Sequence, residues 1–423
     1  MITRTVSGTS DRFSADVRVP GDKSLSHRAL LFAGMAEGDS VVSGLGYGLD
    51  IASTAMALRA LGVTIDHEHV RSPGVGGWLR PNRPIDCGNS GTTMRLLAGI
   101  LSTSRLDVEL VGDPSLSVRT MTRLEGPLSA LGGRIRTTEG HAPLSVGGVN
   151  KVSGGAVTIP MASAQVRSAF ELAALAADGP STIDSPPGYR DHTERWLHAV
   201  GRGEFETDTR FRIDPGPIPT ARYDVPGDPS SAAFLWAAAA ISPGSTITTP
   251  HVSLNPGRIG FLEVLEKMGA HVEATVTDMV GGDPVGSVTV VGHDLTAIAI
   301  DGALVAATLD ELPLVAVVAA YADGITTVRG AGELRTKETD RIHAVEQMLV
   351  ALDGGISVTA DGFDVVGTGF LNGGTVETFH DHRIAMAAAI AATRATGTVE
   401  ILDSNIAAVS WPDFYDTLGA LWL

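Results

Sequence analysis

The chain has 423 residues, of which 43% are hydrophobic and 19% are charged. This length and composition predict a folded protein of two or three domains and exclude a disordered or fibrous chain. The formal net charge of −17 argues against nucleic acid or an anionic membrane surface as a partner.

Apolar runs and cysteine content narrow the class further. The longest apolar runs, residues 234–241 and 312–321, are about half the length of a membrane span. Residues 1–14 are polar, without the pattern of a secretory signal, so we expect a cytoplasmic protein. The single cysteine, Cys87, excludes an internal disulfide framework and a cysteine-based zinc site.

A pattern of an apolar helix followed by a β-branched strand occurs six times along the chain. The expected helices are residues 24–36, 91–101, 164–177, 230–241, 310–322 and 382–395, and the strands that follow them are 39–43, 106–111, 181–183, 245–249, 325–329 and 398–402. A second helix ends several repeats with a glycine that we expect at a C-cap with positive φ: Gly62, Gly132, Gly201 and Gly269. The sixth copy, near Leu418, is degenerate.

A larger repeat divides the six copies into two sets of three. Val19-Pro-Gly-Asp22 recurs as Val225-Pro-Gly-Asp228, and each is followed by an apolar helix, although chance recurrence of a common turn is the alternative. We therefore expect one domain at 19–228 and another formed by 1–18 plus 229–423. The first helix of each repeat is apolar nearly all round, which predicts helices inside and sheets outside.

Polar residues gather at the starts of the expected buried helices. Gly21-Asp-Lys-Ser-Leu-Ser-His-Arg28 places Lys23, Ser24 and Arg28 at a helix N-terminus, where anions bind readily. The alternative is that Ser24 is only the N-cap. Asp86-Cys-Gly-Asn-Ser-Gly-Thr-Thr-Met-Arg95 is typical of a backbone cradle for a charged group. Within it we interpret Cys87 as buried and structural rather than nucleophilic.

The second half of the chain carries two further polar motifs. Glu333-Leu-Arg-Thr-Lys-Glu-Thr-Asp-Arg341 is either a solvated helix face or a functional cluster, with Lys337 and Arg341 stacked at i,i+4. His380-Asp-His-Arg383 has metal-ligand spacing without a third ligand, so zinc is the less favoured interpretation. Asp310, before an apolar helix, is either an N-cap or a base.

Taken together, these motifs resemble the family of 5-enolpyruvylshikimate-3-phosphate synthases, which are enolpyruvyl transferases. The resemblance runs from Val19 to Phe414, and its last two motifs are partly shared with UDP-N-acetylglucosamine enolpyruvyl transferases. The motifs that carry it are Gly-Asp-Lys-Ser-x-Ser-x-Arg, Gly-Asn-Ser-Gly-Thr-Thr-Met-Arg, Ser-Ala-Gln-Val, Arg-Asp-His-Thr-Glu-Arg, Lys-Glu-Thr-Asp-Arg-Ile and Asp-His-Arg-Ile-Ala-Met.

The resemblance implies a fold and a reaction. The implied fold is α/β (α+β), a two-domain inside-out α/β barrel with six βαβαββ repeats, three in each domain, which closes over substrates. The implied reaction moves the enolpyruvyl group of phosphoenolpyruvate to the 5-hydroxyl of shikimate 3-phosphate and releases phosphate through a tetrahedral ketal. It needs no metal and no organic cofactor. We expect a monomer whose partners are these two small molecules, with no nucleic acid or membrane.

The resemblance also implies roles for individual residues. The catalytic residues would be Asp310, which takes the proton of the attacking hydroxyl, Glu338, which serves the methylene carbon, and Lys23. Shikimate 3-phosphate would be held by Lys23, Ser24, Arg28, Ser163, Gln165, Asp310 and Lys337. Phosphoenolpyruvate would be held by Lys23, Gly91, Arg119, Gln165, Arg341 and Arg383.

Two departures from the family pattern bear on the substrate. Tyr189 stands where many members have a serine that binds the shikimate phosphate, and Val409 stands where some have a lysine. Tyr189 keeps a second interpretation open, a paralogous enolpyruvyl transferase acting on another phosphorylated or UDP-linked alcohol. A third, a non-catalytic anion-binding member, is disfavoured because Lys23, Asp310, Lys337 and Glu338 are all present.

Overall fold

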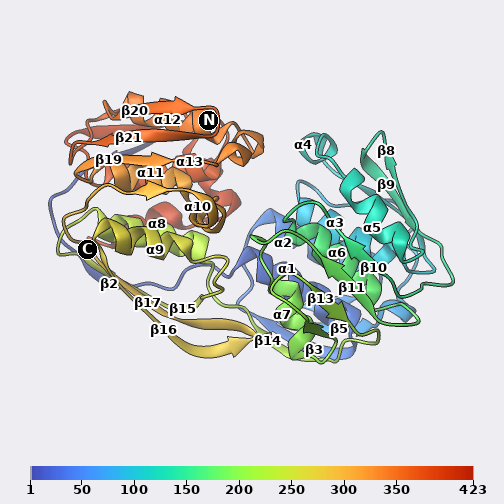
Figure 1. The fold of residues 1–423 in the computed structure, drawn as a ribbon. Helices are drawn as coiled ribbons and strands as arrows, with labels where there is room; N and C mark the ends of the chain where they lie inside the picture. Colours follow the sequence, from blue (N-terminus) through green and yellow to red (C-terminus); the bar gives the residue numbers. More distant parts are fainter. Residues whose placement is uncertain (1, 423) are drawn as a thin grey trace. The chain divides into compact units, whose positions relative to one another are not determined.

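The structure is a computed structural model that describes residues 2–422. It has two compact units, each described by itself (Figure 1). Unit 1 takes its residues from Met1–Pro20, Gly227–Asp278 and Pro284–Leu423, and unit 2 from Gly21–Pro226 and Met279–Asp283. The expected boundaries after 18 and 228 each lie two residues from these, and the short 279–283 segment of unit 2 had no sequence signal.

Unit 2 contains three four-stranded sheets with their helices. The first has the strand order β14 (Arg222–Asp224), β3 (Glu37–Ser43), β5 (His69–Pro73), β4 (Thr64–Asp66), with α1 (Lys23–Met35) and α2 (Leu49–Ala60). The second has β6 (Ile85–Asp86), β7 (Asp107–Val111), β9 (His141–Gly147), β8 (Ile135–Thr138), with α3 (Gly91–Ser102), α4 (Pro114–Ser117) and α5 (Glu125–Ala130). The third has β10 (Ala156–Thr158), β11 (Ser181–Asp184), β13 (Phe211–Ile213), β12 (Gly203–Phe205), with α6 (Ala164–Ala174) and α7 (His192–Ala199).

Unit 1 repeats the plan with one reduced sheet. Its first sheet has β16 (His271–Val280), β17 (Asp283–Val291), β15 (Thr246–Ser253), β2 (Ser14–Asp16), with α8 (Pro229–Ala240) and α9 (Gly260–Met268). The second has β18 (Ala299–Ile300), β19 (Gly324–Val328), β21 (Gly362–Gly367), β20 (Gly355–Thr359), with α10 (Gly302–Thr308), α11 (Leu312–Ala320) and α12 (Arg341–Ala351). The third has only β1 (Arg4–Ser7), β23 (Thr398–Ile401) and β22 (Gly374–Val376), with α13 (His382–Ala392) and α14 (Phe414–Ala420), so the sheet of this repeat has three strands.

The two Val-Pro-Gly-Asp segments mark an exchange of strands between the repeats. In the other sheets, the strand before the inner helix pairs in parallel with the strand after it, as β6 does with β7. Here β2 precedes α1 in sequence but pairs with β15, and β14 precedes α8 but pairs with β3. Each unit therefore takes its first strand from the opposite side of a Val-Pro-Gly-Asp turn, which makes unit 1 discontinuous in sequence.

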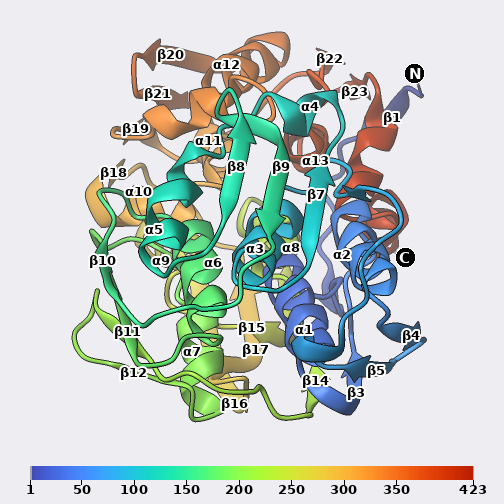
Figure 2. The same ribbon diagram turned by 90° about the vertical axis from the view of Figure 1, so that its right-hand side faces the viewer.

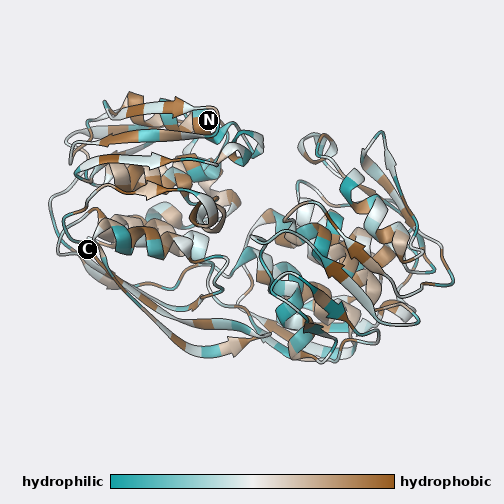
Figure 3. Ribbon diagram, in the orientation of Figure 1, coloured by the Kyte–Doolittle hydropathy of each residue, from teal (hydrophilic) through white to brown (hydrophobic). Residues whose placement is uncertain are grey.

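The inner helices explain why the sheets lie outside. Every residue of α8 and α11 is buried, as are Leu25–Met35 of α1 and all but one residue of α13. A helix that is apolar all round must be enclosed, and the sheets provide the cover. Figure 2 looks onto the sheet containing β7, β8 and β9, with α3 behind it, and Figure 3 shows apolar residues on both the helices and the strands of each unit.

The helix caps agree with the predicted ones in most places. Gly62, Gly132, Gly201 and Gly269 all have positive φ, which confirms the predicted C-cap glycines. The alternative interpretation of Ser24 as the N-cap is wrong: Asp22 is the N-cap of α1, and its side chain accepts a hydrogen bond from the backbone N–H of Leu25. The Asp22 side chain reaches Leu25, so Ser24 already lies inside the first turn.

Within residues 2–422, no single helix is long and apolar enough to cross a membrane. One bent pair of helices, α10 with α11, meets the criterion by length and composition only.

Two glycine substitutions in helices of unit 1 should shift stability in opposite directions. Gly269→Ala should destabilise by about 1 kcal/mol because Gly269 ends α9 at φ +110°, where a side chain is strained. Gly419→Ala, inside α14 with nothing within 4 Å of the added Cβ, should instead stabilise by about 0.5–1 kcal/mol. Urea unfolding of both variants beside the wild type measures the difference, and equal shifts would contradict the assignment of Gly269 as a left-handed cap.

Candidate active site

The N-terminus of α1 in unit 2 presents a lysine beside a carboxylate. Lys23 is the first residue of α1, and its Nζ lies 3.4 Å from Oδ2 of Asp50 on α2. The Lys23 side chain is about half exposed. A partly exposed ammonium at a helix N-terminus is suited to an anionic ligand, because both the free backbone N–H groups and the positive charge attract it.

Arg28 lies one turn further along α1 and is buried. Its Nε donates to Oγ1 of Thr193 at 2.8 Å, one terminal nitrogen donates to Oγ of Ser168 at 2.9 Å, and the other to the backbone oxygen of Ser24 at 3.0 Å. Burial lowers the pKa of Arg28, and the nearby charge of Glu194 opposes that shift. Arg28 therefore joins the start of α1 to α6 and α7 through neutral hydroxyl groups.

The start of α3 forms the cradle that its glycines predicted. Ser90 is the N-cap, and its Oγ accepts a hydrogen bond from the backbone N–H of Thr93 at 3.1 Å. A Cβ on Gly91 would lie 2.9 Å from a terminal nitrogen of Arg95 and 3.6 Å from one of Arg119. Because Gly91 has no side chain, the space beside the guanidinium groups of Arg95 and Arg119 stays open. Any other residue at this position would fill that space.

Arg95 and Arg123 belong to this cluster, although sequence reasoning assigned neither a role. Burial, together with the charges of Arg123 and Arg119, lowers the pKa of Arg95 to about 10. None of the three arginines forms an ion pair with a carboxylate anywhere in residues 2–422; Arg119 donates to Oδ1 of Asn89 at 2.9 Å. Three guanidinium groups without a counter-charge are suited to a dianion.

The start of α6 completes the cluster in unit 2. Ser163 is its N-cap, and the amide of Gln165 bridges to α3. Oε1 of Gln165 accepts a hydrogen bond from Arg95, and Nε2 donates to Oγ1 of Thr92 at 3.0 Å. Helices α1, α3 and α6 are therefore joined at their N-terminal ends, and the predicted residues of unit 2 lie there together.

A second cluster lies in unit 1 around Asp310. Its Oδ1 is 3.8 Å from Nζ of Lys337 and 3.5 Å from a terminal nitrogen of Arg341. Asp310 lies in the turn before α11, and Glu311 occupies the N-cap position without a side-chain capping bond. The cap interpretation of Asp310 therefore has no support, whereas two cations lie within 4 Å of its carboxylate.

Arg341 is the buried centre of this second cluster, with a side chain only 1% exposed. Its Nε donates to Oδ2 of Asp381 at 2.7 Å, and a terminal nitrogen donates to Oε2 of Glu338 at 2.7 Å. Arg383 donates to the backbone oxygen of Asp310 at 2.8 Å and lies 3.2 Å from Oε1 of Glu311. Arg341 and Arg383 are thus paired with carboxylates, unlike Arg95, Arg119 and Arg123 of unit 2.

The expected helical stacking of Lys337 and Arg341 was wrong. Gly332–Thr336 is a 3-10 helix, Lys337 has extended backbone, and α12 begins at Arg341, capped by Asp340. The capping preference of the aspartate starts a new helix within the charge run. Both cations nevertheless reach Asp310, from two different elements.

The His380-Asp-His motif serves packing and capping. Asp381 caps α13 through the backbone N–H of Arg383 and pairs with Arg341, while Nδ1 of His380 lies 2.7 Å from Oδ2 of Asp403. Within residues 2–422, no group of three or more histidine, cysteine or acidic side chains is placed to hold a metal ion.

The two departures from the family pattern take different environments. The ring of Tyr189 lies over the guanidinium of Arg167 at 3.9 Å, and its hydroxyl donates to the backbone oxygen of Asp208 at 3.3 Å. Val409 is exposed at the end of a 3-10 helix in unit 1. The Tyr189 hydroxyl is therefore already engaged by the protein backbone.

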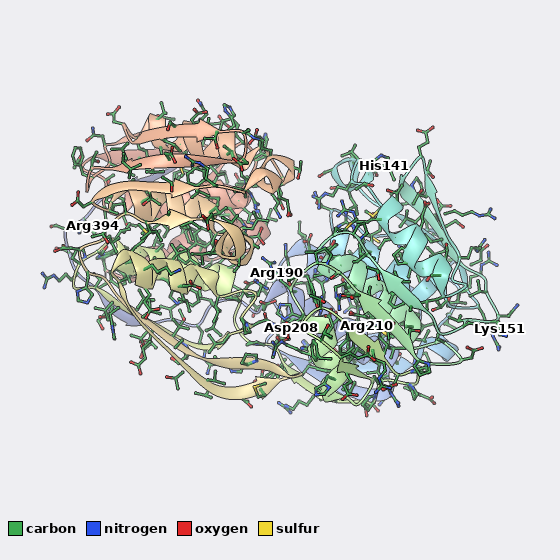
Figure 4. All side chains as sticks on the ribbon, in the orientation of Figure 1. His141, Lys151, Arg190, Asp208, Arg210 and Arg394 are labelled. Atoms are coloured by element: carbon green, nitrogen blue, oxygen red, sulfur yellow. The ribbon has the colours of Figure 1, made fainter. Side chains whose placement is uncertain are left out.

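The four lysines divide into two kinds. Lys151 and Lys267 are exposed and lie near surface carboxylates, Lys151 at 4.0 Å from Asp178 and Lys267 at 2.7 Å from Glu263. Figure 4 shows Lys151 at the outer edge of unit 2. Only Lys23 and Lys337 lie in the two clusters.

Comparison with known proteins identifies the family. The profile of EPSP synthase (3-phosphoshikimate 1-carboxyvinyltransferase) matches residues 8–418. The chain belongs to the EPSP synthase family. It is 46% identical over 420 residues to a 3-phosphoshikimate 1-carboxyvinyltransferase of Chloroflexus aurantiacus, covering 96% of each chain, and 42% identical over 426 residues to one of Syntrophomonas wolfei, covering 99% of each.

A solved structure agrees with this family and with the fold. EPSP synthase from Acinetobacter baumannii superimposes with a TM-score of 0.91 at 36% identity, covering 99% of this chain and 98% of that one. The chain is therefore an enzyme of the carboxyvinyltransferase class, and the expected two-domain inside-out α/β fold is confirmed.

Removal of the buried Arg341 should destabilise unit 1 strongly. Arg341→Met leaves Asp381, which is fully buried, without its guanidinium, so we expect a loss of about 3–5 kcal/mol in the free energy of unfolding. Arg335→Met is the matched control, because the Arg335–Asp340 pair is about one-third exposed and should cost below about 1 kcal/mol. Equal losses in urea unfolding would contradict the central role of Arg341.

The thiol of Cys87 should be inert in the folded protein. Cys87 is buried, and burial raises the pKa of its thiol to about 12, with a smaller effect from Asp86. At pH 8 only about 1 in 10,000 thiols is then ionised, so iodoacetamide should label the protein in urea but not in buffer. Rapid labelling of the folded protein, followed by mass spectrometry, would contradict this.

Proposed function

We propose that this enzyme transfers the enolpyruvyl group of phosphoenolpyruvate to the 5-hydroxyl of shikimate 3-phosphate, with release of phosphate. The observation that carries the proposal is the family match over residues 8–418, together with an anion site of unpaired arginines in unit 2. Both substrates are polyanions, and such a site provides the charge that they require.

The first role of the residues is to hold the two anions. Lys23, Ser24, Arg28, Ser163, Gln165, Asp310 and Lys337 would bind shikimate 3-phosphate, and Lys23, Gly91, Arg119, Gln165, Arg341 and Arg383 would bind phosphoenolpyruvate. The unpaired guanidinium of Arg119 and the open backbone at Gly91 support the second set in unit 2. Arg341 and Arg383 would exchange part of their contacts with Glu338 and Glu311 for the substrate.

The second role is proton transfer. Asp310 would accept the proton of the 5-hydroxyl as its oxygen bonds to C2 of phosphoenolpyruvate, while C3 gains a proton and becomes a methyl group. Glu338 would serve C3, and Lys23 would stabilise charge on the phosphate. Loss of a C3 proton from the tetrahedral ketal, with departure of phosphate, then restores the double bond.

Three further expectations belong to this proposal. The chemistry balances with protons and phosphate alone, so no metal or organic cofactor is required. We also propose a monomer that acts in the cytoplasm. Size-exclusion chromatography with light scattering tests whether the enzyme is a monomer, and subcellular fractionation tests its location.

The decisive experiment is a phosphate-release assay with phosphoenolpyruvate and one of two acceptors. We expect release with shikimate 3-phosphate and none with UDP-N-acetylglucosamine. Release with the nucleotide sugar alone would overturn the proposal in favour of a paralogous enolpyruvyl transferase.

Replacement of the base should remove turnover without unfolding the protein. Asp310→Asn keeps the shape of the side chain but cannot accept the proton, so kcat should fall at least ~100-fold. Asp364→Asn is the control, because Asp364 pairs with Arg329 away from the cluster, and it should keep kcat. Near-normal kcat in Asp310→Asn, measured by the same phosphate release, would remove Asp310 from this role.

A further inference from the structure

A chain of buried hydrogen bonds runs across three helices of unit 2. Nδ1 of His27 on α1 lies 2.7 Å from Oγ1 of Thr54 on α2, and that oxygen lies 2.6 Å from Oγ1 of Thr93 on α3. Oγ1 of Thr93 donates to Oγ of Ser90 at 2.8 Å or to the backbone oxygen of Asp50 at 3.3 Å. The four side chains that form this hydrogen-bond path, those of His27, Thr54, Thr93 and Ser90, are fully buried.

The direction of the protons in this chain follows from its geometry. Thr93 has one hydroxyl proton, and both of its acceptors, Ser90 and Asp50, use that proton. When that proton is used in this way, Thr54 donates to Thr93 and its own oxygen accepts from Nδ1–H of His27. This tautomer also leaves no N–H on the buried Nε2, which has no hydrogen-bond partner within residues 2–422, so every donation points from α1 toward the start of α3.

The ring of His27 must be neutral for this arrangement. Nε2 of His27 is buried and has no hydrogen-bond partner within residues 2–422, so a second ring proton would have no acceptor. The pKa of His27 is lowered to about 3, mainly by burial; the charge of Asp50 opposes the shift, and the charges of Lys23 and Arg28 support it. The imidazole thus acts as a fixed donor over the whole physiological pH range.

Both ends of the chain lie beside residues of the anion site. His27 is adjacent to Arg28 on α1, and Ser90 caps α3 directly before Gly91. Asp50, which accepts from Thr93 through its backbone, also lies 3.4 Å from Nζ of Lys23 through its side chain. The hydrogen bonds therefore set the distance between two helix N-termini that would bind the same ligand.

We propose that His27 is a positioning residue, which holds the Gly91 cradle of α3 in register with Lys23 of α1 through Thr54 and Thr93. The inference rests on the proposed function, because the register matters only if both helix ends contact one substrate. A shift of about 1 Å between such groups is enough to lower a rate ~100-fold. Directional hydrogen bonds fix the two helix ends more precisely than an apolar contact at Thr54 would.

The kinetic test uses an isosteric substitution. Thr54→Val keeps the volume but removes the bonds to His27 and Thr93, and we expect KM for phosphoenolpyruvate to rise at least ~10-fold. Thr54→Ser keeps the hydroxyl and should restore KM to near the wild-type value. Ser72→Ala is the matched control: it removes a buried hydroxyl bonded to Gly34 at the other end of α1, so it should lower Tm without raising KM.

The second test reads the proton position directly in the folded wild-type protein. With 15N-labelled histidine, long-range 1H–15N correlation should show one histidine as the Nδ1–H tautomer, unchanged from pH 5 to pH 8. Loss of that signal in His27→Gln identifies it. If His27→Gln does not fold, Thr54→Ser should perturb the same signal and identifies it instead.

The outcomes separate the inference from the proposed function. No phosphate release by the wild type would overturn the function, whereas a wild-type KM in Thr54→Val, with an active wild-type enzyme, would overturn the positioning role alone. An Nε2–H tautomer for His27, or titration between pH 5 and pH 8, would also overturn it. A raised KM that Thr54→Ser restores, together with the Nδ1–H tautomer, would establish it.

Discussion

The structure depends on inner helices that are too apolar to touch water. In each unit such helices must be enclosed by sheets, so their few polar residues remain at the helix ends. In unit 2 the N-terminal ends of α1, α3 and α6 are joined by the bonds of Arg28 to Ser168 and of Gln165 to Thr92. The free N–H groups at the starts of these helices and the cations beside them therefore share one end of the bundle, which is the basis of the proposed anion site.

The two clusters differ in whether carboxylates compensate the positive charge of their arginines. In unit 1, Arg341 contacts Asp381, Glu338 and Asp310, so its charge is compensated before any ligand arrives. In unit 2, Arg95 has only neutral hydrogen-bond partners, and its pKa is lowered mainly by burial and in addition by repulsion from Arg123 and Arg119. A bound anion would relieve that repulsion, so under the proposed function we expect the affinity for phosphoenolpyruvate to come mainly from unit 2. Arg341 would contribute by exchanging a carboxylate partner for the substrate.

Periodicity predicted the six inner helices and their strands within a few residues, because a buried helix has an unmistakable apolar composition. Glycine spacing predicted the left-handed caps for a similar local reason. The stacking of Lys337 on Arg341 was wrong for a local reason too, because Asp340 starts a new helix after Lys337. The cap of α1 is likewise decided locally, by Asp22 rather than by the alternative Ser24. The chain from His27 to Ser90 could not be predicted, since its members lie 27, 39 and 3 residues apart and meet only after α1, α2 and α3 pack.

Net charge and lysine content bear on the site less directly than the pairing of arginines does. The chain carries a formal charge of −17, and yet its proposed substrates are anions. Two of its four lysines, Lys151 and Lys267, lie in ordinary surface pairs, so scarcity of lysine does not by itself identify a site. A largely buried guanidinium without a carboxylate partner is costly, because it loses water without gaining a counter-charge, and Arg95 is such a group. Arg119 and Arg123 add positive charge beside it, and under the proposed function a bound anion would compensate all three.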